Sequence, residues 1–71
     1  MERFLRYSLD HSRPIRGVLL MDGKLVQKTF TVLALDRDEA TLGLGSGKPP
    51  LILPCRDILS CDYARGDHGD A

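Results

Sequence analysis

The dipeptide Asp22-Gly23 constrains the fold of this chain more than any other feature. It lies between two runs rich in β-branched and apolar residues, and Asp-Gly in such a position is the strongest short-range signal for a two-residue β-hairpin turn. Residues 16–21 and 24–35 are therefore predicted to pair as antiparallel strands. The second run has one apolar face, made of Val26, Phe30, Val32 and Ala34. Lys28 interrupts this face, so we expect a bulge or an exposed edge near it.

The rest of the chain predicts one short helix and three more strands. Residues 2–10 place apolar side chains on one side of a helix, and Pro14 stops a helix beyond about residue 12. Further strands are expected at three short apolar runs, 40–44, 51–54 and 58–63. Residues 55–57 are expected to form a tight turn before the last strand. This order predicts a mainly β fold: a short N-terminal helix, then a closed or nearly closed five-stranded antiparallel SH3/Sm-like barrel.

The chain has 71 residues, enough for a single small domain with a limited core. We assign residues 1–63 to a small β-barrel domain. Residues 64–71, ARGDHGDA, carry no large apolar side chain and are predicted to be a disordered tail. The Arg-Gly-Asp tripeptide in this tail is interpreted as a chance occurrence.

The location expected for this chain is cytoplasmic, without membrane association, because the N-terminus is charged and no apolar run reaches the length of a membrane span. The two cysteines, Cys55 and Cys61, lie six positions apart in one extended segment. At about 3.3 Å per residue they would be roughly 20 Å apart, which is too far for a disulfide.

The stretch GLGSGK, residues 43–48, resembles a phosphate-binding loop but lacks its essential positions. A P-loop ending at Lys48 requires glycine at position 42 and a hydroxyl residue at 49, where this chain has Leu42 and Pro49. A Gly-Ser-Gly turn between two strands explains the same residues. His11 and His68 belong to no recognised ligand spacing, and the carboxylates cluster in a solvated turn. The sequence therefore predicts no enzyme activity, no cofactor and no metal site.

Charge is distributed unevenly along a chain whose formal net charge is zero. Residues 1–28 have a net charge of +3 and residues 29–71 a net charge of −3. A basic half of this kind can present a surface to phosphates or to an acidic ligand. The candidate contact residues for a ligand or a nucleic acid are Arg13, Arg16, Lys24, Lys28 and Lys48.

The order of elements resembles the WYL domain, an Sm-like β-barrel module of bacterial transcriptional regulators that is thought to sense ligands or nucleic acid. The resemblance runs from about Leu5 to Asp62. It rests on the basic strand Arg13-Pro14-Ile15-Arg16, on Asp22-Gly23, and on an apolar rhythm near the end that comprises Leu53, Cys55, Ile58 and the following Leu59-Ser60. The Trp-Tyr-Leu triad would fall on residues 40–42, where only Leu42 is kept, and Lys48 keeps one of the expected basic positions. The resemblance thus implies a barrel that serves as a scaffold for another task.

Two functions follow as hypotheses. The first is a non-enzymatic regulatory module that holds a protein partner, a second copy of itself or a small ligand. Self-association is expected through an edge strand or the helix face of Phe4 and Leu5. The alternative is an Sm-like RNA-binding protein that uses the basic N-terminal half. Only Tyr7 and Tyr63 are expected to be available for base stacking, so nucleic-acid binding is expected to be weak.

Overall fold

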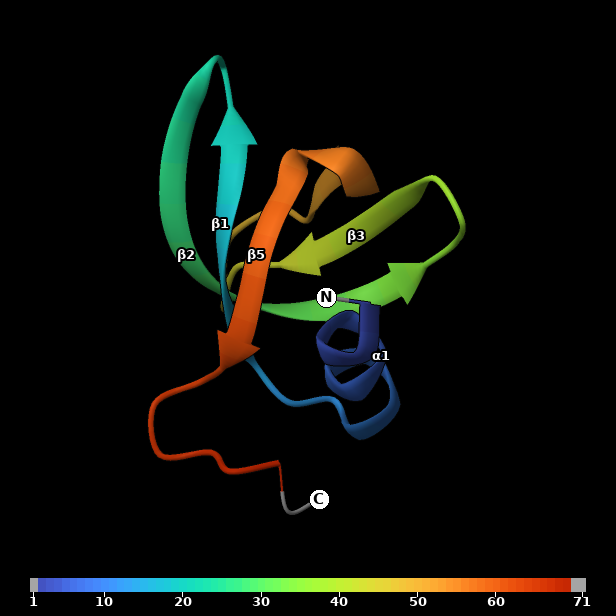
Figure 1. Cartoon of the computed structure of the whole chain (residues 1–71), viewed down its shortest axis with the longest axis vertical. Coiled ribbons are helices and arrows are strands. Elements are labelled where there is room, and N and C mark those ends of the chain that lie inside the picture. Colours follow the sequence, from blue (N-terminus) through green and yellow to red (C-terminus); the bar gives the residue numbers. More distant parts are fainter. Residues whose placement is uncertain (1, 70–71) are drawn as a thin grey trace.

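The computed structural model describes residues 2–69 of the chain. Along the chain its elements are α1 (Glu2–His11), β1 (Ile15–Met21), β2 (Lys24–Leu35), β3 (Glu39–Gly43), β4 (Leu51–Pro54), a 3₁₀ turn η1 (Cys55–Asp57) and β5 (Ile58–Tyr63) (Figure 1). The predicted helix, the five antiparallel strands and the turn at 55–57 are all confirmed. Residues 70 and 71 of the predicted tail lie outside the described part.

The hairpin of β1 and β2 forms as Asp-Gly predicts. Asp22 and Gly23 both have positive φ, 52° and 76°, which is the backbone of the type I′ turn that matches the twist of paired strands. The register then runs from Met21 opposite Lys24 to Ile15 opposite Phe30. This pairing places Ile15, Leu19 and Phe30 on one face, and all three are buried.

Strand β2 joins the two halves of the sheet because it is long and strongly curved (Figure 1). Its residues 24–30 pair with β1, and its residues 31–35 pair with β3. The strand order is therefore β4-β3-β2-β1-β5. Because β2 bends between its two partners, the β1–β5 half and the β3–β4 half turn their buried faces toward each other.

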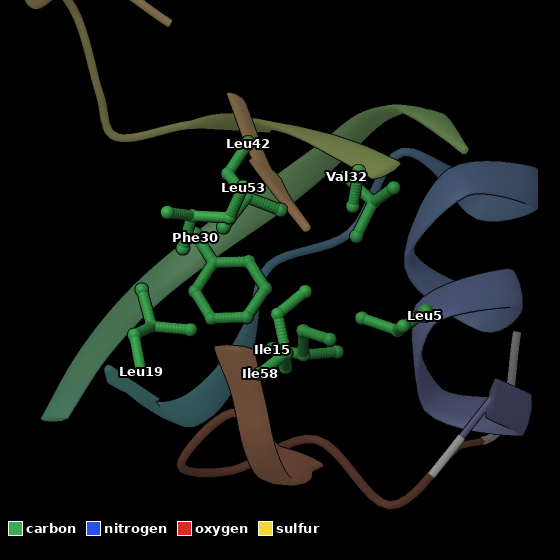
Figure 2. Packing of buried hydrophobic residues seen from close by; sticks show 9 residues of the cluster. Leu5, Ile15, Leu19, Phe30, Val32, Leu42, Leu53 and Ile58 are labelled. Atoms are coloured by element: carbon green, nitrogen blue, oxygen red, sulfur yellow. The ribbon is translucent and has the colours of Figure 1, made fainter. Parts of the chain in front are cut away.

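The core fills the space between these halves (Figure 2). Its buried side chains are Leu5, Ile15, Leu19, Phe30, Val32, Ala40, Leu42, Leu53 and Ile58. Leu5 comes from α1, and Figure 2 shows it pointing from the helix toward the side chains that the strands contribute. Burial of a Leu, Ile or Phe side chain stabilises a fold by about 1.5–3 kcal/mol, so this small set supplies most of the stability.

The predicted barrel is wrong in one respect, because the sheet does not close. Within residues 2–69, β4 and β5 are the edges of the sheet and are not paired with each other. β4 has only four residues and ends at Pro54, which has no N–H to donate, and η1 then carries the chain across to β5. The helix α1 packs mainly against β2 and places Leu5 in the core.

Two β-bulges adjust the faces of the sheet. The register of β2 with β3 steps from Val32–Leu42 to Ala34–Thr41, which leaves Leu33 as the extra residue. The expected membership of Ala34 in the apolar face is therefore wrong: the bulge turns Ala34 outward, and it is exposed. The pairing around Lys28 is regular, so no bulge lies there, but residues 24–30 pair with β1 and not with β3, so the expected exposed edge is present. In the second bulge, the register of β5 with β1 leaves Leu59 as the extra residue.

The hydrogen bonds of Ser8 join the helix to the sheet. Ser8 is fully buried. Its Oγ donates to the carbonyl oxygen of Arg13 at 2.6 Å and accepts from the N–H of Val32 at 2.9 Å. Val32 lies in the half of β2 that has left β1, so Ser8 takes the place of a neighbouring strand for this donor. None of the described helices is long and apolar enough to cross a membrane.

Candidate functional site

The solvent-facing side of strands β5, β1 and β2 is the best-defined candidate surface, and we call it the outer face. Side chains alternate across a strand, so the residues beside the buried Ile15, Leu19 and Phe30 point to solvent. Pairing aligns two rows of three residues and one pair. The charged row is Asp62, Arg16 and Thr29, and the middle row is Ser60, Val18 and Gln27. What we call the leucine row is the pair Leu20–Leu25 together with Leu59, the unpaired bulge residue of β5.

The leucine row exposes a large amount of apolar surface for so small a molecule. Leu25 is 68% exposed and Leu59 is 48% exposed. Leu20 lies directly opposite Leu25 in the ladder. Leu59 has no partner in β1, because it is the extra residue between Ser60, which is opposite Val18, and Ile58, which is opposite Leu19. Single exposed leucines are ordinary, but a cross-strand leucine pair with a third exposed leucine on the same sheet offers apolar surface of the kind that proteins use for binding.

Arg16 anchors the opposite end of the outer face. Its Nε donates to the carbonyl oxygen of Tyr63 at 3.0 Å, and one Nη lies 3.9 Å from a carboxylate oxygen of Asp62. The Arg16 and Asp62 side chains are 42% and 68% exposed. An exposed pair at this distance contributes little to stability, and several guanidinium N–H groups stay available to a ligand.

A shallow groove of about 330 Å³ runs over β1 between Arg16 and the middle row. Gln27, Ser60 and Asp62 supply its polar walls. Cys61 also borders it, and burial raises the pKa of this thiol to about 11. The Cys61 thiol is therefore protonated at neutral pH and is not an activated nucleophile. The groove offers hydrogen bonds and one charge pair rather than catalytic groups.

A second hollow, of about 450 Å³, lies between the start of α1 and the β2–β3 turn. Leu5 and Leu35 contribute apolar lining, while Arg6 and Arg37 are among its charged residues. Asp36 also lines it, but one oxygen of this carboxylate accepts the N–H groups of Asp38 and Glu39, both at 2.8 Å. These N–H groups hold the pKa of Asp36 below its ordinary value, so Asp36 shapes the turn.

Arg13 lies at a third place, where the tail meets the helix. Tyr7 Oη donates to Asp67 at 2.8 Å, and Arg13 Nη1 lies 3.2 Å from Tyr7 Oη and 3.5 Å from Asp67. The Asp67 side chain is 14% exposed, and its oxygen also accepts the Gly69 N–H at 2.9 Å. These contacts give the tail an attachment point, while its predicted disorder stays a prediction. They also occupy the aspartate of the Arg-Gly-Asp tripeptide.

The structure does not bring the predicted contact residues together. Arg13 belongs to the tail contact and Arg16 to the outer face. Lys24 and Lys28 share the opposite face of β2, since they pair with Met21 and Gly17 on the core side of β1. Lys48 is exposed in the loop between β3 and β4, where its N–H donates to Gly45. The five residues therefore form no single basic surface.

Sequence reasoning missed the leucine row. The hairpin turn does predict that Leu20 opposes Leu25, because a two-residue turn fixes the register. It gives no sign of Leu59, whose orientation depends on a bulge in β5. The outer face was therefore recognisable in part, from the Asp-Gly turn alone.

Comparison of the chain with protein-family models, with curated proteins and with solved structures finds no match.

Proposed function

We propose that this chain is a small non-catalytic binding module, built on an SH3/Sm-like sheet, that holds a protein partner on its outer face. The observation that carries the proposal is the leucine row: the exposed Leu25 is paired with the partly buried Leu20, and Leu59 is about half exposed at the bulge of β5. Apolar residues in the centre of a protein interface supply most of its free energy, and polar residues at the rim set its orientation. The charged row next to the leucines provides such a rim.

Several features support a scaffold over a catalyst. The outer face lies on paired strands, so its residues keep fixed positions without loops. The groups that border its groove include one protonated thiol and one exposed charge pair. The resemblance to WYL domains, with the family triad reduced to Leu42, is consistent with a regulatory scaffold that has lost the family's own binding residues.

A small ligand is the second candidate. The hollow beside α1 has a volume of about 450 Å³, which falls in the usual range for small-molecule sites. Its lining combines apolar side chains with two arginines and two carboxylates, Glu2 and Asp36, which suits a ligand with a hydrocarbon part and polar groups of both signs. This candidate and the protein partner use different surfaces and can be separated by mutation.

The test is affinity capture from a lysate of the source cells with three tagged proteins: the wild type, Leu25→Asp and Ile52→Asp. Ile52 is 60% exposed on β4, so its replacement is a matched control for adding a charge to an exposed apolar strand position. We expect one protein to be retained by the wild type and the Ile52 variant and lost by the Leu25 variant. Equal retention by all three, or nucleic acid as the retained species, would contradict the proposal.

A further inference from the structure

We propose that the partner on the outer face is a second copy of this chain, and that two copies pack face to face through their leucine rows. This inference rests on the proposed function, because it gives an occupant to the same surface. The occupant is chosen from the charges of the face. Arg16 and Asp62 lie side by side in one row, so the face carries both members of an ion pair and is complementary to itself.

Symmetry decides how the two faces meet. A pair of identical faces is related by a two-fold axis lying between them. If that axis is parallel to β1, each row meets its own copy. The leucine rows then cover each other, and the charged rows face each other at the other end. An axis perpendicular to β1 would place Arg16 and Asp62 on leucines, which would bury charges without partners.

The parallel arrangement also allows new ion pairs. Two sheets packed face to face lie about 10 Å apart, with strands aligned to within about 30°. The rotation exchanges the β2 and β5 sides, so Arg16 faces Arg16 of the second copy and lies diagonally across from the second copy's Asp62; each guanidinium has to turn toward that carboxylate and away from the like charge. A long arginine side chain can reach that carboxylate while its Nε still donates to Tyr63. The existing Arg16–Asp62 contact at 3.9 Å is loose enough to be exchanged.

The other exposed apolar side chains are less suited to this role. Leu33 and Ile52 lie on the outside of the β2–β3–β4 half. The space above Gly43 is already taken by Leu33, since a Cβ at Gly43 would lie 3.3 Å from it. The facing strand positions Thr31, Thr41 and Gly43 are uncharged, so nothing there fixes an orientation. The Phe4 and Leu5 helix face, expected to associate, is used internally: Leu5 is 3% exposed and Phe4 packs on Tyr63.

Three strands make a small interface, below the roughly 800 Å² per partner of stable complexes, so the dimer should dissociate at micromolar concentrations. Sedimentation equilibrium from about 5 to about 500 µM would measure this, because Kd values of weak complexes fall in that range. We expect a monomer–dimer equilibrium for the wild type and for Ile52→Asp. Leu25→Asp should weaken the dimer at least about tenfold, since it places a charge in the leucine contact.

A charge-exchange experiment makes the test independent of stability. Arg16→Asp gives a face with acidic residues only in its charged row, and Asp62→Arg gives a face with basic residues only. Each variant alone should dimerise at least about tenfold more weakly than the wild type, because like charges meet. An equimolar mixture should recover a 1:1 complex, seen by native mass spectrometry or by labelling one variant.

The outcomes separate this inference from the proposed function. A wild type that stays monomeric to about 500 µM, or a mixture that gains nothing over its components, overturns the second copy as partner. If a different protein is then captured in a Leu25-dependent manner, the outer face is still the binding surface. If Leu25→Asp changes neither self-association nor capture, the proposed function fails as well.

Discussion

The missing side chain at Gly17 lets β1 lie between the Phe30 ring and β5. A Cβ built at this position would lie 2.9 Å from Phe30 Cε2 and 2.9 Å from the carbonyl oxygen of Ser60. The ring is fully buried and the oxygen belongs to a paired strand, so neither neighbour can move independently. Gly17 therefore controls both the core on one side of β1 and the outer face on the other.

We expect Gly17→Ala to destabilise the fold by about 1–3 kcal/mol, the usual cost of adding a methyl group to a filled core. The midpoint of urea unfolding, monitored by circular dichroism, measures the change. Gly43→Ala is the matched control, because the nearest atoms to its Cβ would belong to the exposed Leu33 side chain, at 3.3 Å. It should shift the midpoint much less. Equal losses for both variants would show that the contacts of Gly17 are not what limits this position.

Asp67 is the residue through which pH should act on the tail. The Gly69 N–H, followed by the Tyr7 hydroxyl, lowers its pKa below the ordinary value of 3.8. A carboxyl group with a lowered pKa in the folded state contributes stability that is complete above the ordinary pKa and is lost as pH falls through the folded value. Burial, and then the bond to Asp67, raises the pKa of Tyr7 above 10.0. The stability that the Tyr7 hydroxyl contributes is present below pH 10.0 and is lost as pH rises through the raised pKa of the folded state.

We therefore expect the tail to stay attached between about pH 5 and pH 9 and to detach at acid pH while the sheet stays folded. The Gly69 amide resonance should move with the acid transition, since its N–H donates to Asp67. Asp67→Asn should leave this resonance at its detached position across the acid range. An amide that has random-coil shifts at neutral pH in the wild type would show that the tail is disordered, as the composition of residues 64–71 predicts.

At the scale of elements, Ser8 determines how α1 covers the sheet. Its hydroxyl is bonded to two backbone groups, the N–H of Val32 and the carbonyl of Arg13. The first belongs to the half of β2 that pairs with β3 on one side and has no strand on the side that β1 has left, and the second to the turn that follows the helix. A helix that supplied only apolar contacts would leave the Val32 N–H buried without a partner, which costs about 1–3 kcal/mol.

Ser8→Ala should accordingly destabilise the protein by about 1–3 kcal/mol, and amide exchange at Val32 should become faster. Ser60→Ala is the control, because Ser60 is exposed on the outer face and surface changes are usually within about 0.5 kcal/mol. Thermal unfolding and hydrogen exchange measure the two quantities. If exchange at Val32 is unchanged in the Ser8 variant, this donor has another partner and the helix is held by its other contacts, such as those of Leu5 and Phe4.

The sequence predicts local structure better than it predicts whether the sheet closes or which face of the sheet a side chain occupies, and the reason is physical. Residues within a few positions of each other determine the positive φ of Asp22 and Gly23 and the end of α1 before Pro14. These features can therefore be predicted from the sequence. The bulges at Leu33 and Leu59 depend on partner strands, and they decide that Ala34 and Leu59 face solvent. The open edge between β4 and β5 likewise depends on how strands far apart in the sequence are arranged.

At the scale of the whole molecule, the distribution of charge in space determines which surfaces are basic, more than the net positive charge of residues 1–28 does. Along the chain, residues 1–28 have a net charge of +3. In space, Asp67 faces Arg13 at 3.5 Å and Asp62 faces Arg16 at 3.9 Å, and both acids come from the acidic half. Folding thus brings the two halves of the charge pattern together, and the remaining candidate lysines lie on other surfaces.

We expect no binding of single-stranded RNA or DNA tighter than about 10 µM at physiological salt, which is the range of non-specific contact. Stacking of bases contributes about 1–3 kcal/mol each where aromatic rings are accessible. Here Tyr63 packs edge-on against Phe4 and Tyr7, with ring centroids 4.9 and 5.1 Å apart, and the Tyr7 hydroxyl is bonded to Asp67. The rings are therefore engaged within the protein, and phosphate contacts alone are left.

Fluorescence anisotropy with a labelled oligonucleotide at several salt concentrations measures this affinity. Any residual binding should weaken by about 0.7 log units per decade of salt for each phosphate contact. Asp67→Asn, which weakens the tail contact, should change the affinity for the oligonucleotide by less than about threefold. The substitution removes the carboxylate that faces Arg13 but does not create a continuous basic surface. Sub-micromolar affinity that is lost when Arg13 and Arg16 become alanine would replace the protein-binding proposal with the nucleic-acid alternative, because it would show that two separated arginines suffice for tight recognition.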